Sequence, residues 1–452
     1  MRLRKTITTI VATAILLAGW QLFAVIANQP ELIPSLPRLV RTLCEWLVSG
    51  SFYQSVGATI LRGVLGMSIS FVCAIGMAGL FARFEWVYEL FRPLLAIMRS
   101  IPVISFILLA LIFLNPESIP LMIAFLTMFP LLTENLTRGI LDLRPGLSIM
   151  ARQFHIKRSN VLFQIIYPQL KPFLYSGLAS AAGFGWRAII MGEVLSQCAF
   201  GIGSEMKRAQ NFIAVPELLA WTIVAVFISF FFDKGISKVA DITPKISFAN
   251  EDQTIPTPTL SVLDTKDISY QYGIQHFSHS FQKGIIYGIS APSGKGKTTL
   301  LNLIGGILLP TEGEIHPTRH FGIATIFQQP QLLPHLTAEE NIILPLSSFL
   351  TEEKARRIAQ KHLQEMEMEP FGNRYPKELS YGQQQRIAIA RALAYPSPLL
   401  LMDEPFKGLD EALSHRIIER IREMQMKEER IILFTSHNPD EIRLLADEVI
   451  YL

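Results

Sequence analysis

Long apolar stretches alternate with short polar connections over the first half of the chain, and this pattern predicts helices that cross a membrane. A helix needs about 20 mostly apolar residues to cross ~30 Å of hydrocarbon. The third of the candidate stretches is the least regular, because Arg99, Ser100 and Pro102 interrupt it. We expect an all-α membrane domain of about six spans within residues 1–240. The candidate spans are roughly 7–27, 56–82, 92–114, 119–138, 173–198 and 216–233.

Basic residues are distributed unevenly among the connections, and this predicts the orientation of the spans. Arg2, Arg4 and Lys5 precede the first apolar run, which is too long for a signal-peptide core and lacks a small-residue cleavage site, so we expect an uncleaved helix. Alternate connections carry most of the remaining Lys and Arg, which favours a cytoplasmic location for them. An even number of spans then returns the chain to the cytoplasm before residue 240.

The hydrophobic pattern changes after the last apolar run. Residues 241–259 contain three prolines and little periodicity, which is typical of a linker. From Leu260 onward, short strand-like apolar runs alternate with helical patterns, which indicates an α/β domain. We therefore expect a transmembrane domain over 1–240, a linker over 241–259 and an α/β domain over 260–452.

Composition and charge agree with two domains in different solvents. Half of the residues are hydrophobic and only 17% are charged, which excludes a disordered or collagen-like chain. Residues 1–250 hold 21 Lys and Arg against 12 Asp and Glu, whereas residues 251–452 hold 20 against 26. Nucleic acid is not an expected partner, because the basic surplus lies on the membrane half. Cys44, Cys73 and Cys198 lack metal or redox spacing and are expected to pack in the core.

A glycine-rich segment after the strand-like run 284–290 predicts a phosphate-binding loop that opens a helix. In such a loop, successive backbone N–H groups and the helix N-terminus point at a phosphate. Lys297 would bridge the β- and γ-phosphates of a nucleotide, and the Thr298 hydroxyl would bind Mg²⁺. The loop departs from the usual pattern at its first position, where alanine replaces glycine. Its residues are Ala291, Pro292, Ser293, Gly294, Lys295, Gly296, Lys297, Thr298 and Thr299.

Two further strand ends carry candidate catalytic residues. The apolar run 399–402 ends in Asp403 and Glu404, of which Asp403 would complete the metal site. Glu404 would polarise a water for attack on the γ-phosphate. The alternative interpretation is a strand with an acidic pair at the surface. His437 follows another apolar run and is expected to contact the γ-phosphate, although a lone histidine in a loop is often only structural.

Charged residues in the membrane half raise two further questions. The basic connection 141–172 has helical spacing, and it is interpreted either as a loop on the lipid surface or as a helix that docks into another domain. Arg187 and Glu193 lie within the fifth span, where a charge costs ~2.5–3.5 kcal/mol. Either residue could contact a transported solute or bond to a neighbouring helix. A role in the solute path predicts that Glu193→Gln changes uptake without changing basal ATP turnover.

The segment 375–393, Tyr-Pro-Lys-Glu-Leu-Ser-Tyr-Gly-Gln-Gln-Gln-Arg-Ile-Ala-Ile-Ala-Arg-Ala-Leu, resembles the signature sequence of ABC ATPases. The resemblance implies that each signature covers an ATP bound to the other subunit, and Tyr381 stands where the family usually has glycine. It also implies that Gln328 is the Q-loop residue, which senses Mg²⁺, and that Tyr272, rather than Tyr270, stacks on adenine. The remaining residues implied to bind nucleotide are Ser380, Gly382, Gln383 and Asp410.

The membrane half resembles ABC importer permeases. Residues 150–170 are similar to the family's coupling loop, although Ile149 and His155 depart from its usual Glu and Gly. Two other segments, 99–102 and 129–135, resemble the nitrate, sulfonate and taurine branch of the family. This likeness implies a type I importer architecture and an extracytoplasmic solute-binding protein as partner.

Together these features predict an ABC importer half-transporter that works as a homodimer, with ATP and Mg²⁺ as cofactors. It is expected to be a multi-pass protein of the cytoplasmic membrane, in contact with lipid, and to hold its ATPase domain in the cytoplasm. The alternatives are an ABC exporter, whose helices usually reach farther into the cytoplasm, and a regulatory ABC ATPase of low turnover, which the departures at Ala291 and Tyr381 would suit.

Overall fold

The computed structural model describes residues 2–240, 244–253, 260–271, 273–292, 294–317 and 322–452. The chain divides into two compact units, which are considered separately. The first comprises residues 1–143 and 169–243, and the second comprises 144–168 and 244–452. This division differs from the expected boundaries at two places, because residues 144–168 of the expected membrane domain and residues 244–253 of the expected linker lie with the α/β unit.

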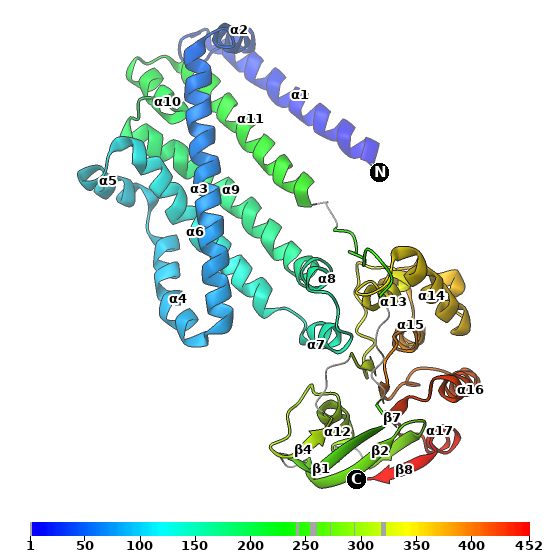
Figure 1. Ribbon diagram of the computed structural model, residues 1–452. Helices are drawn as coiled ribbons and strands as arrows, with labels where there is room; N and C mark the ends of the chain where they lie inside the picture. The colour runs from blue at the N-terminus through cyan, green and yellow to red at the C-terminus, as the bar shows by residue number, and fades with distance from the viewer. Residues whose placement is uncertain (1, 241–243, 254–259, 272, 293, 318–321) are drawn as a thin grey trace. The chain divides into compact units, whose positions relative to one another are not determined.

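The first unit is entirely helical in its described part. Figure 1 shows α3, α6, α9 and α11 running beside one another as a bundle, with α1 apart from them. Among the described residues, four helical stretches are long and apolar enough to cross a membrane, namely 50–83, 116–141, 158–196 and 215–238, and a bent pair of helices over 85–113 makes a fifth if it counts as one span. The helices are α1 (Arg2–Ala27), α2 (Leu36–Trp46), α3 (Gly50–Arg83), α4 (Glu85–Ser100), α5 (Val103–Phe113), the 3-10 turn η1 (Pro116–Ser118), α6 (Ile119–Leu141), α9 (Tyr167–Ser196), α10 (Ile202–Asn211) and α11 (Val215–Ala240).

The expected third span, 92–114, is two helices rather than one. The axes of α4 and α5 are bent by 95° at the break between them. Pro102 lacks an N–H group and disfavours helical geometry at the preceding residue, and Ile101 is accordingly extended, with ψ 130°. The irregularity seen in the sequence at Arg99, Ser100 and Pro102 is therefore a sharp bend. Within the part of α1 whose side chains are described, the apolar stretch is Val11–Ala27.

Small residues set the packing of the bundle. Gly66 of α3 faces α6 so closely that a Cβ built on it would lie 2.6 Å from the Cβ of Ala124. Small side chains let helix backbones approach one another, which is the usual basis of helix association in lipid. The buried core between these helices includes Ala74, Ala78 and Leu132.

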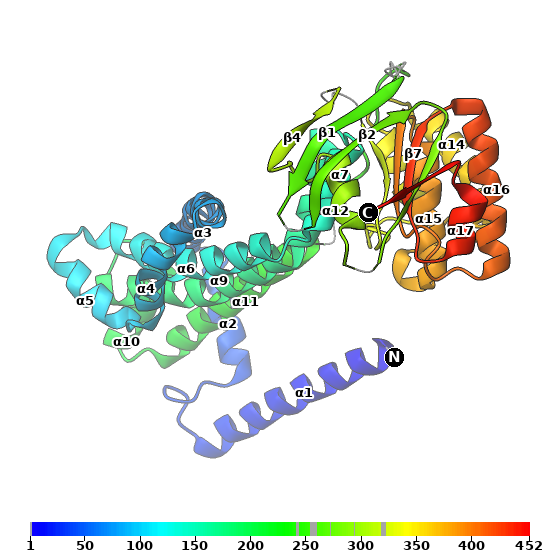
Figure 2. The same cartoon turned by 90° about the horizontal axis from the view of Figure 1, so that it is seen from below.

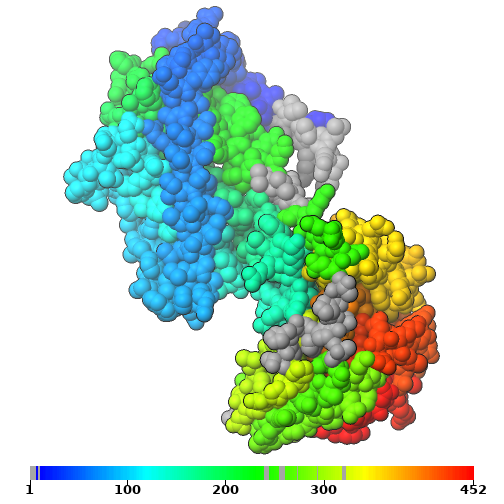
Figure 3. All heavy atoms as spheres, in the orientation of Figure 1, coloured from blue at the N-terminus to red at the C-terminus, as the bar shows by residue number. Residues whose placement is uncertain are grey.

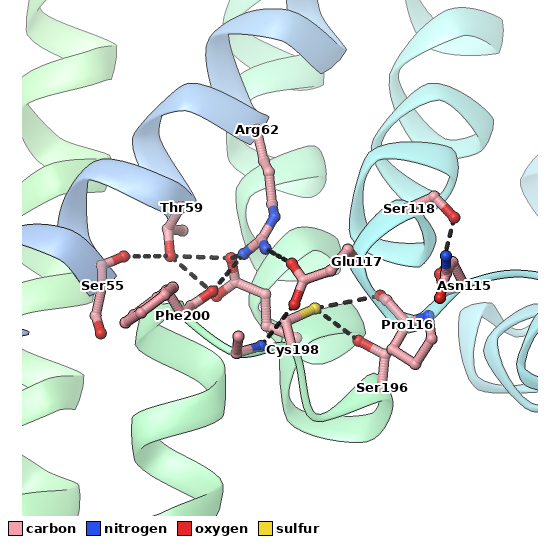
Figure 4. A network of polar contacts seen from close by, with 12 residues as sticks. Ser55, Thr59, Arg62, Asn115, Pro116, Glu117, Ser118, Ser196, Cys198 and Phe200 are labelled. Atoms are coloured by element: carbon pink, nitrogen blue, oxygen red, sulfur yellow. Dashed lines mark hydrogen bonds and ion pairs between the residues drawn. The ribbon is translucent and has the colours of Figure 1, made fainter.

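Glu193 of α9 is fully buried and joins several elements of the bundle. Figure 4 labels its partners Thr59 and Arg62, together with Glu117. Its carboxylate accepts hydrogen bonds from Arg62 Nη1 at 2.7 Å, from Thr59 Oγ1 at 2.9 Å and from the backbone N–H of Gly203 at 2.9 Å. The other guanidinium nitrogen of Arg62 pairs with Glu117 at 2.5 Å. Of the two interpretations of Glu193, the contacts favour bonding to neighbouring helices. Arg187, by contrast, is exposed.

The second unit contains two sheets. A three-stranded antiparallel sheet has the order β2-β1-β4, and a five-stranded parallel sheet has the order β5-β6-β7-β3-β8. Figure 2 shows the antiparallel sheet as a layer distinct from α14 to α17. The strands are β1 (Val262–Tyr270), β2 (Ile274–Gln282), β3 (Ile286–Ser290), β4 (Glu312–His316), β5 (Ala324–Ile326), β6 (Leu399–Asp403), β7 (Ile431–Thr435) and β8 (Glu448–Tyr451).

Helices cover one face of the parallel sheet, and α12 (Lys297–Ile304) together with the antiparallel sheet covers the other, so the central strands β6 and β7 are buried at every residue. This explains why both appear in the sequence as uninterrupted apolar runs. The helices of the unit are α7 (Pro145–Gln153), α8 (Arg158–Asn160), the π-helical turn η2 (Val161–Ile166), α12 (Lys297–Ile304), α13 (Ala338–Leu346), α14 (Glu352–Glu365), the 3-10 turns η3 (Glu369–Phe371) and η4 (Pro376–Glu378), α15 (Tyr381–Ala394), α16 (Glu411–Glu428) and α17 (Pro439–Leu445).

Residues 144–168, here called the docking segment, belong to the second unit because their apolar side chains complete its core. Phe154 is fully buried, with its ring 5.1 Å from that of Tyr395 in an edge-on contact. The Arg391 guanidinium lies 5.4 Å from the centre of the Phe154 ring. Leu147 and Met150 are buried in the same cluster. The structure therefore shows docking, one of the two interpretations of this connection.

Part of the expected linker is also packed on the second unit. The backbone N–H of Gln253 donates to Phe349 O at 2.8 Å, and Asp252 Oδ1 accepts from the backbone N–H of Thr351 at 2.9 Å. Ile246 and Phe248 pack against the core, and this apolar contact holds residues 244–253 on the second unit. Figure 3 shows these residues beside the docking segment. Residues 241–243 and 254–259 of the linker lie outside the described part.

Candidate functional site

The candidate catalytic residues meet at one edge of the parallel sheet. The phosphate loop follows β3, Asp403 and Glu404 stand at the end of β6, and His437 follows β7. These three strands are consecutive in the sheet order. Because they are parallel, their carboxyl ends open at the same edge, which is where α/β proteins bind ligands.

The phosphate loop has the backbone geometry that its glycines allow. Gly294 has φ +81° and Gly296 has φ +88°, both in the left-handed region that favours glycine. Lys297 opens α12, and its Nζ donates to Ala291 O at 2.7 Å and lies 3.2 Å from His437 Nδ1. Ala291 is not among the described residues with positive φ, so alanine fits there without backbone strain. Ser293 lies outside the described residues.

Thr298 and Asp403 are brought together as predicted for a metal site. Thr298 Oγ1 donates to Asp403 Oδ2 at 2.9 Å, and Thr435 Oγ1 donates to Asp403 Oδ1 at 2.8 Å. Burial raises the pKa of Asp403, and the hydrogen bonds from Thr435 and Thr298 oppose that change. A hydroxyl and a carboxylate are hard oxygen ligands, which fits Mg²⁺ with its remaining positions taken by water and phosphate.

Glu404 lies between two cationic or titratable partners. Its Oε1 is 2.9 Å from His437 Nε2, and its Oε2 is 3.2 Å from Lys407 Nζ. Partial burial acts to raise the pKa of Glu404, but hydrogen bonding from Lys407 and Gln328 outweighs burial and leaves the pKa below its usual value. Glu404 also has φ +48°, a strained conformation of the kind found at functional sites.

The signature residues form a separate group at the start of α15. Ser380 Oγ accepts a hydrogen bond from the backbone N–H of Gln383 at 3.3 Å, and Gln383 Oε1 accepts from the Ser380 N–H at 2.9 Å. This reciprocal pair is a capping box. Gly382 is part of the same first turn. The hydroxyl of Tyr381 donates to Gln328 O at 2.8 Å, which joins the start of α15 to the segment that follows β5.

Three other predicted residues are placed as follows. Asp410 caps α16, accepting a hydrogen bond from the Leu413 N–H at 2.9 Å. Gln328 is exposed and follows β5. Tyr272, the predicted adenine-stacking residue, lies outside the described residues.

Two residues of the site were missed in the sequence. Thr435 holds Asp403 because the two are paired in the register of β6 and β7, which no single strand reveals. Lys407 reaches Glu404 from three residues farther along the chain. That spacing was visible, but only the turn after β6 brings the two together.

Comparison with known proteins accounts for both units. The profile of ABC transporters matches residues 274–407, and the profile of the inner-membrane component of binding-protein-dependent transport systems matches residues 68–233.

Relatives of the second unit are ATP-binding proteins. The thiamine import ATP-binding protein ThiQ of Yersinia pseudotuberculosis is 34% identical over 205 residues, which cover 42% of this chain and 86% of that protein. An uncharacterised ABC transporter ATP-binding protein of Methanocaldococcus jannaschii is 34% identical over 201 residues, which cover 40% of this chain and 85% of that protein. The Fe(3+) ions import ATP-binding protein FbpC of Rhizobium etli is 35% identical over 189 residues, which cover 40% and 54%.

This chain thus spans about half the length of FbpC and of several other curated relatives. Among solved structures, a dimeric post-hydrolysis state of an ATP-binding cassette bound to ADP and phosphate has 32% identity. The match covers 42% of this chain and 94% of the chain in that structure, with a TM-score of 0.40.

Proposed function

Because the chain belongs to the ABC transporter family, with an importer-type permease followed by an ABC ATPase, we propose that it hydrolyses ATP to drive uptake of a small solute across the cytoplasmic membrane. One observation carries this proposal. Lys297, Asp403, Glu404 and His437 converge at the carboxyl ends of three adjacent parallel strands, in a chain whose other unit has helices long enough to span a membrane.

Each residue of this cluster has a part in the reaction. Glu404 accepts a proton from the attacking water, and its lowered pKa keeps it ionised for that purpose. The water oxygen bonds to the γ-phosphorus, and the bond from that phosphorus to the bridging oxygen breaks to leave ADP. His437 contacts the γ-phosphate and holds Glu404 at 2.9 Å. Bound Mg²⁺ would supply charge neutralisation of the phosphates, held by Thr298, Asp403 and Gln328.

The remaining assignments concern ATP itself. Residues 291–299 surround the phosphates, and Lys297 supplies the positive charge. Tyr272 stacks on adenine. The signature of one copy covers the ATP that is bound to the phosphate loop of the other copy. Within one chain, the signature residues form a group separate from the phosphate loop. These are Ser380, Gly382, Gln383 and, across the dimer, Asp410.

The working unit that we propose is a homodimer in lipid, with an extracytoplasmic solute-binding protein. Residues 1–240 act as the permease, 241–259 as the linker and 260–452 as the ATPase. The docking segment supports this arrangement, because it belongs to the permease in sequence and yet packs into the core of the ATPase unit. Closure of two ATPase units can therefore move a segment that is continuous with the membrane helices α6 and α9.

ATP hydrolysis by the purified chain in lipid vesicles tests the enzymatic part. Glu404→Gln should reduce hydrolysis by about 100-fold or more while ATP still binds, because the general base is lost and the phosphate loop is intact. Glu411→Gln is a matched control, since Glu411 is an exposed acid in the first turn of α16. Hydrolysis that is equal in the two variants would contradict the proposal.

Solute movement tests the direction of transport. Uptake into vesicles should require both ATP on the ATPase side and an added solute-binding protein on the other. An exporter would move solute without that protein. A regulatory ATPase of low turnover, the function that Tyr381 in the signature would favour, would bind ATP and show neither uptake nor rapid hydrolysis.

A further inference from the structure

The start of α15 is attached to both loops that flank Glu404. Tyr381 Oη donates to Gln328 O at 2.8 Å, and Gln385 Nε2 donates to Pro405 O at 3.0 Å in a buried contact. Gly382 approaches the second loop so closely that a Cβ built on it would lie 2.6 Å from Gly408 O. The signature segment and the surroundings of Glu404 are therefore in direct contact within one chain.

Tyr381 makes the most adjustable of these contacts. Its side chain is 42% exposed, and its ring lies over Gly408, where a Cβ would come within 2.7 Å of Tyr381 Cδ1. Gly408 has φ +80°, so glycine is required there on both grounds. Water can replace a neutral hydrogen bond at an exposed site at small net cost. The bond from Tyr381 to Gln328 can therefore open and close during a reaction cycle, whereas the buried bond of Gln385 holds.

Gln328 connects this bond to the catalytic glutamate. Its carbonyl oxygen accepts a hydrogen bond from Tyr381, and its side chain forms a hydrogen bond with Glu404. Glu404 in turn contacts His437 at 2.9 Å. A displacement of Tyr381 thus reaches the general base through one intervening residue.

We propose that Tyr381 is a positioning residue that couples the two ATP sites of the dimer. The inference rests on the proposed function, in which the signature of one copy covers the ATP held by the other. When that ATP engages the signature segment, Tyr381 moves with it, and the backbone of Gln328 in its own chain follows. Occupancy of one site then alters the position of Glu404 in the other site.

The first test is the dependence of hydrolysis on ATP concentration. The wild-type chain should hydrolyse ATP cooperatively, with a Hill coefficient above one. Tyr381→Phe removes only the hydroxyl and keeps the ring over Gly408, and it should lower the Hill coefficient to about one. Tyr451→Phe is the matched control, because Tyr451 is 79% exposed in the same unit and lies outside the site. An unchanged Hill coefficient in Tyr381→Phe would overturn the proposal.

Mixed dimers show in which copy Tyr381 acts. When one copy carries Glu404→Gln, only the other copy hydrolyses ATP. Adding Tyr381→Phe to the hydrolysing copy should change its maximal rate by about two- to tenfold, the equivalent of one hydrogen bond. The same substitution on the copy that carries Glu404→Gln should leave the rate near that of the mixed dimer alone. The reverse pattern would mean that the hydroxyl acts on the opposite nucleotide, and it would overturn the proposal.

Failure of this inference can be distinguished from failure of the proposed function. A wild-type chain that hydrolyses ATP without cooperativity, and loses hydrolysis in Glu404→Gln, contradicts the role of Tyr381 alone. A wild-type chain that does not hydrolyse ATP, or that is indifferent to Glu404→Gln, contradicts the proposed function.

Discussion

Asn160 and Ser247 form a reciprocal pair of hydrogen bonds. Asn160 Nδ2 donates to Ser247 O at 2.8 Å, and the Ser247 N–H donates to Asn160 Oδ1 at 2.8 Å. Asn160 Nδ2 also lies 2.8 Å from Ser347 Oγ, at the C-terminal end of α13. One buried side chain therefore joins the docking segment, the segment before the ATPase and the ATPase core.

The first prediction concerns this pair. Asn160→Ala should destabilise the second unit by about 1–3 kcal/mol, because the backbone N–H and C=O of the half-buried Ser247 lose their partners. It should also free residues 244–253 for cleavage in limited proteolysis. Thermal unfolding of the full chain in detergent measures the loss of stability, and limited proteolysis measures the exposure of residues 244–253. Asn211→Ala is the control, since Asn211 is exposed. Equal protease resistance of the two variants would show that the pair does not hold the segment.

The second prediction concerns the ring of Phe154. Phe154→Ala should cost about 3–5 kcal/mol, the usual loss for a buried aromatic side chain. The loss of the ring also removes a contact of the buried Arg391 guanidinium. Burial lowers the pKa of Arg391 to about 9, so this group is still charged at neutral pH. Its partners are Gln331 O at 2.8 Å, Pro330 O at 2.9 Å and the Phe154 ring.

Unfolding of the full chain, followed by the fluorescence of a bound nucleotide analogue, measures the loss for Phe154→Ala. Phe163→Ala is the matched control, because Phe163 lies in the same docking segment but is 47% exposed. The control should change stability by less than about 1 kcal/mol. Similar losses in the two variants would contradict the packing described for Phe154.

Local features of the site could be predicted from the sequence because their chemistry is local. The turn from β3 into α12 needs glycines at Gly294 and Gly296, and the structure shows positive φ at both. Buried parallel strands require continuous apolar runs, and the run before Asp403 forms β6 as expected. The roles of these residues can be predicted from their immediate neighbours in the chain.

Relationships between distant segments could not be predicted in the same way. The partner of Glu193 is Arg62, 131 residues away. The pairing of Asp403 with Thr435 depends on strand register, which apolar runs do not specify. The packing of residues 244–253 was missed because three prolines suggested a linker, whereas Ile246 and Phe248 supply enough apolar surface to bind the core.

The third prediction concerns the pH dependence of hydrolysis. Glu404 must be ionised to accept a proton, and hydrogen bonding from Lys407 helps to keep its pKa low. Lys407→Met should therefore raise the pKa of Glu404, so that protonation begins at higher pH and the acid limb of the kcat/KM profile moves to higher pH. Lys407→Arg should keep the limb near its wild-type position. Lys427→Met, at an exposed position on α16, controls for lost surface charge. An unshifted limb in Lys407→Met would remove Lys407 from this role.

The last prediction concerns Glu193 and Arg62 in the membrane unit. Glu193 is fully buried, and Arg62 is 13% exposed, so removing one charge leaves the other poorly solvated. Glu193→Gln should destabilise the chain by about 3–5 kcal/mol, which is typical of breaking a buried pair from one side. Arg62→Gln combined with Glu193→Gln should cost less than the sum of the two single changes, because no buried charge is left unpaired and Glu117, which loses Arg62, is 53% exposed.

Thermal unfolding in detergent measures this double-mutant cycle, and Glu89→Gln serves as control, since Glu89 is 62% exposed and lies 3.9 Å from Arg92. Solute uptake should fall in Glu193→Gln only as far as the folded fraction falls. If uptake is lost while the unfolding temperature stays unchanged, Glu193 acts in the solute path. The hydrogen-bond network of Figure 4 would then not be needed for stability.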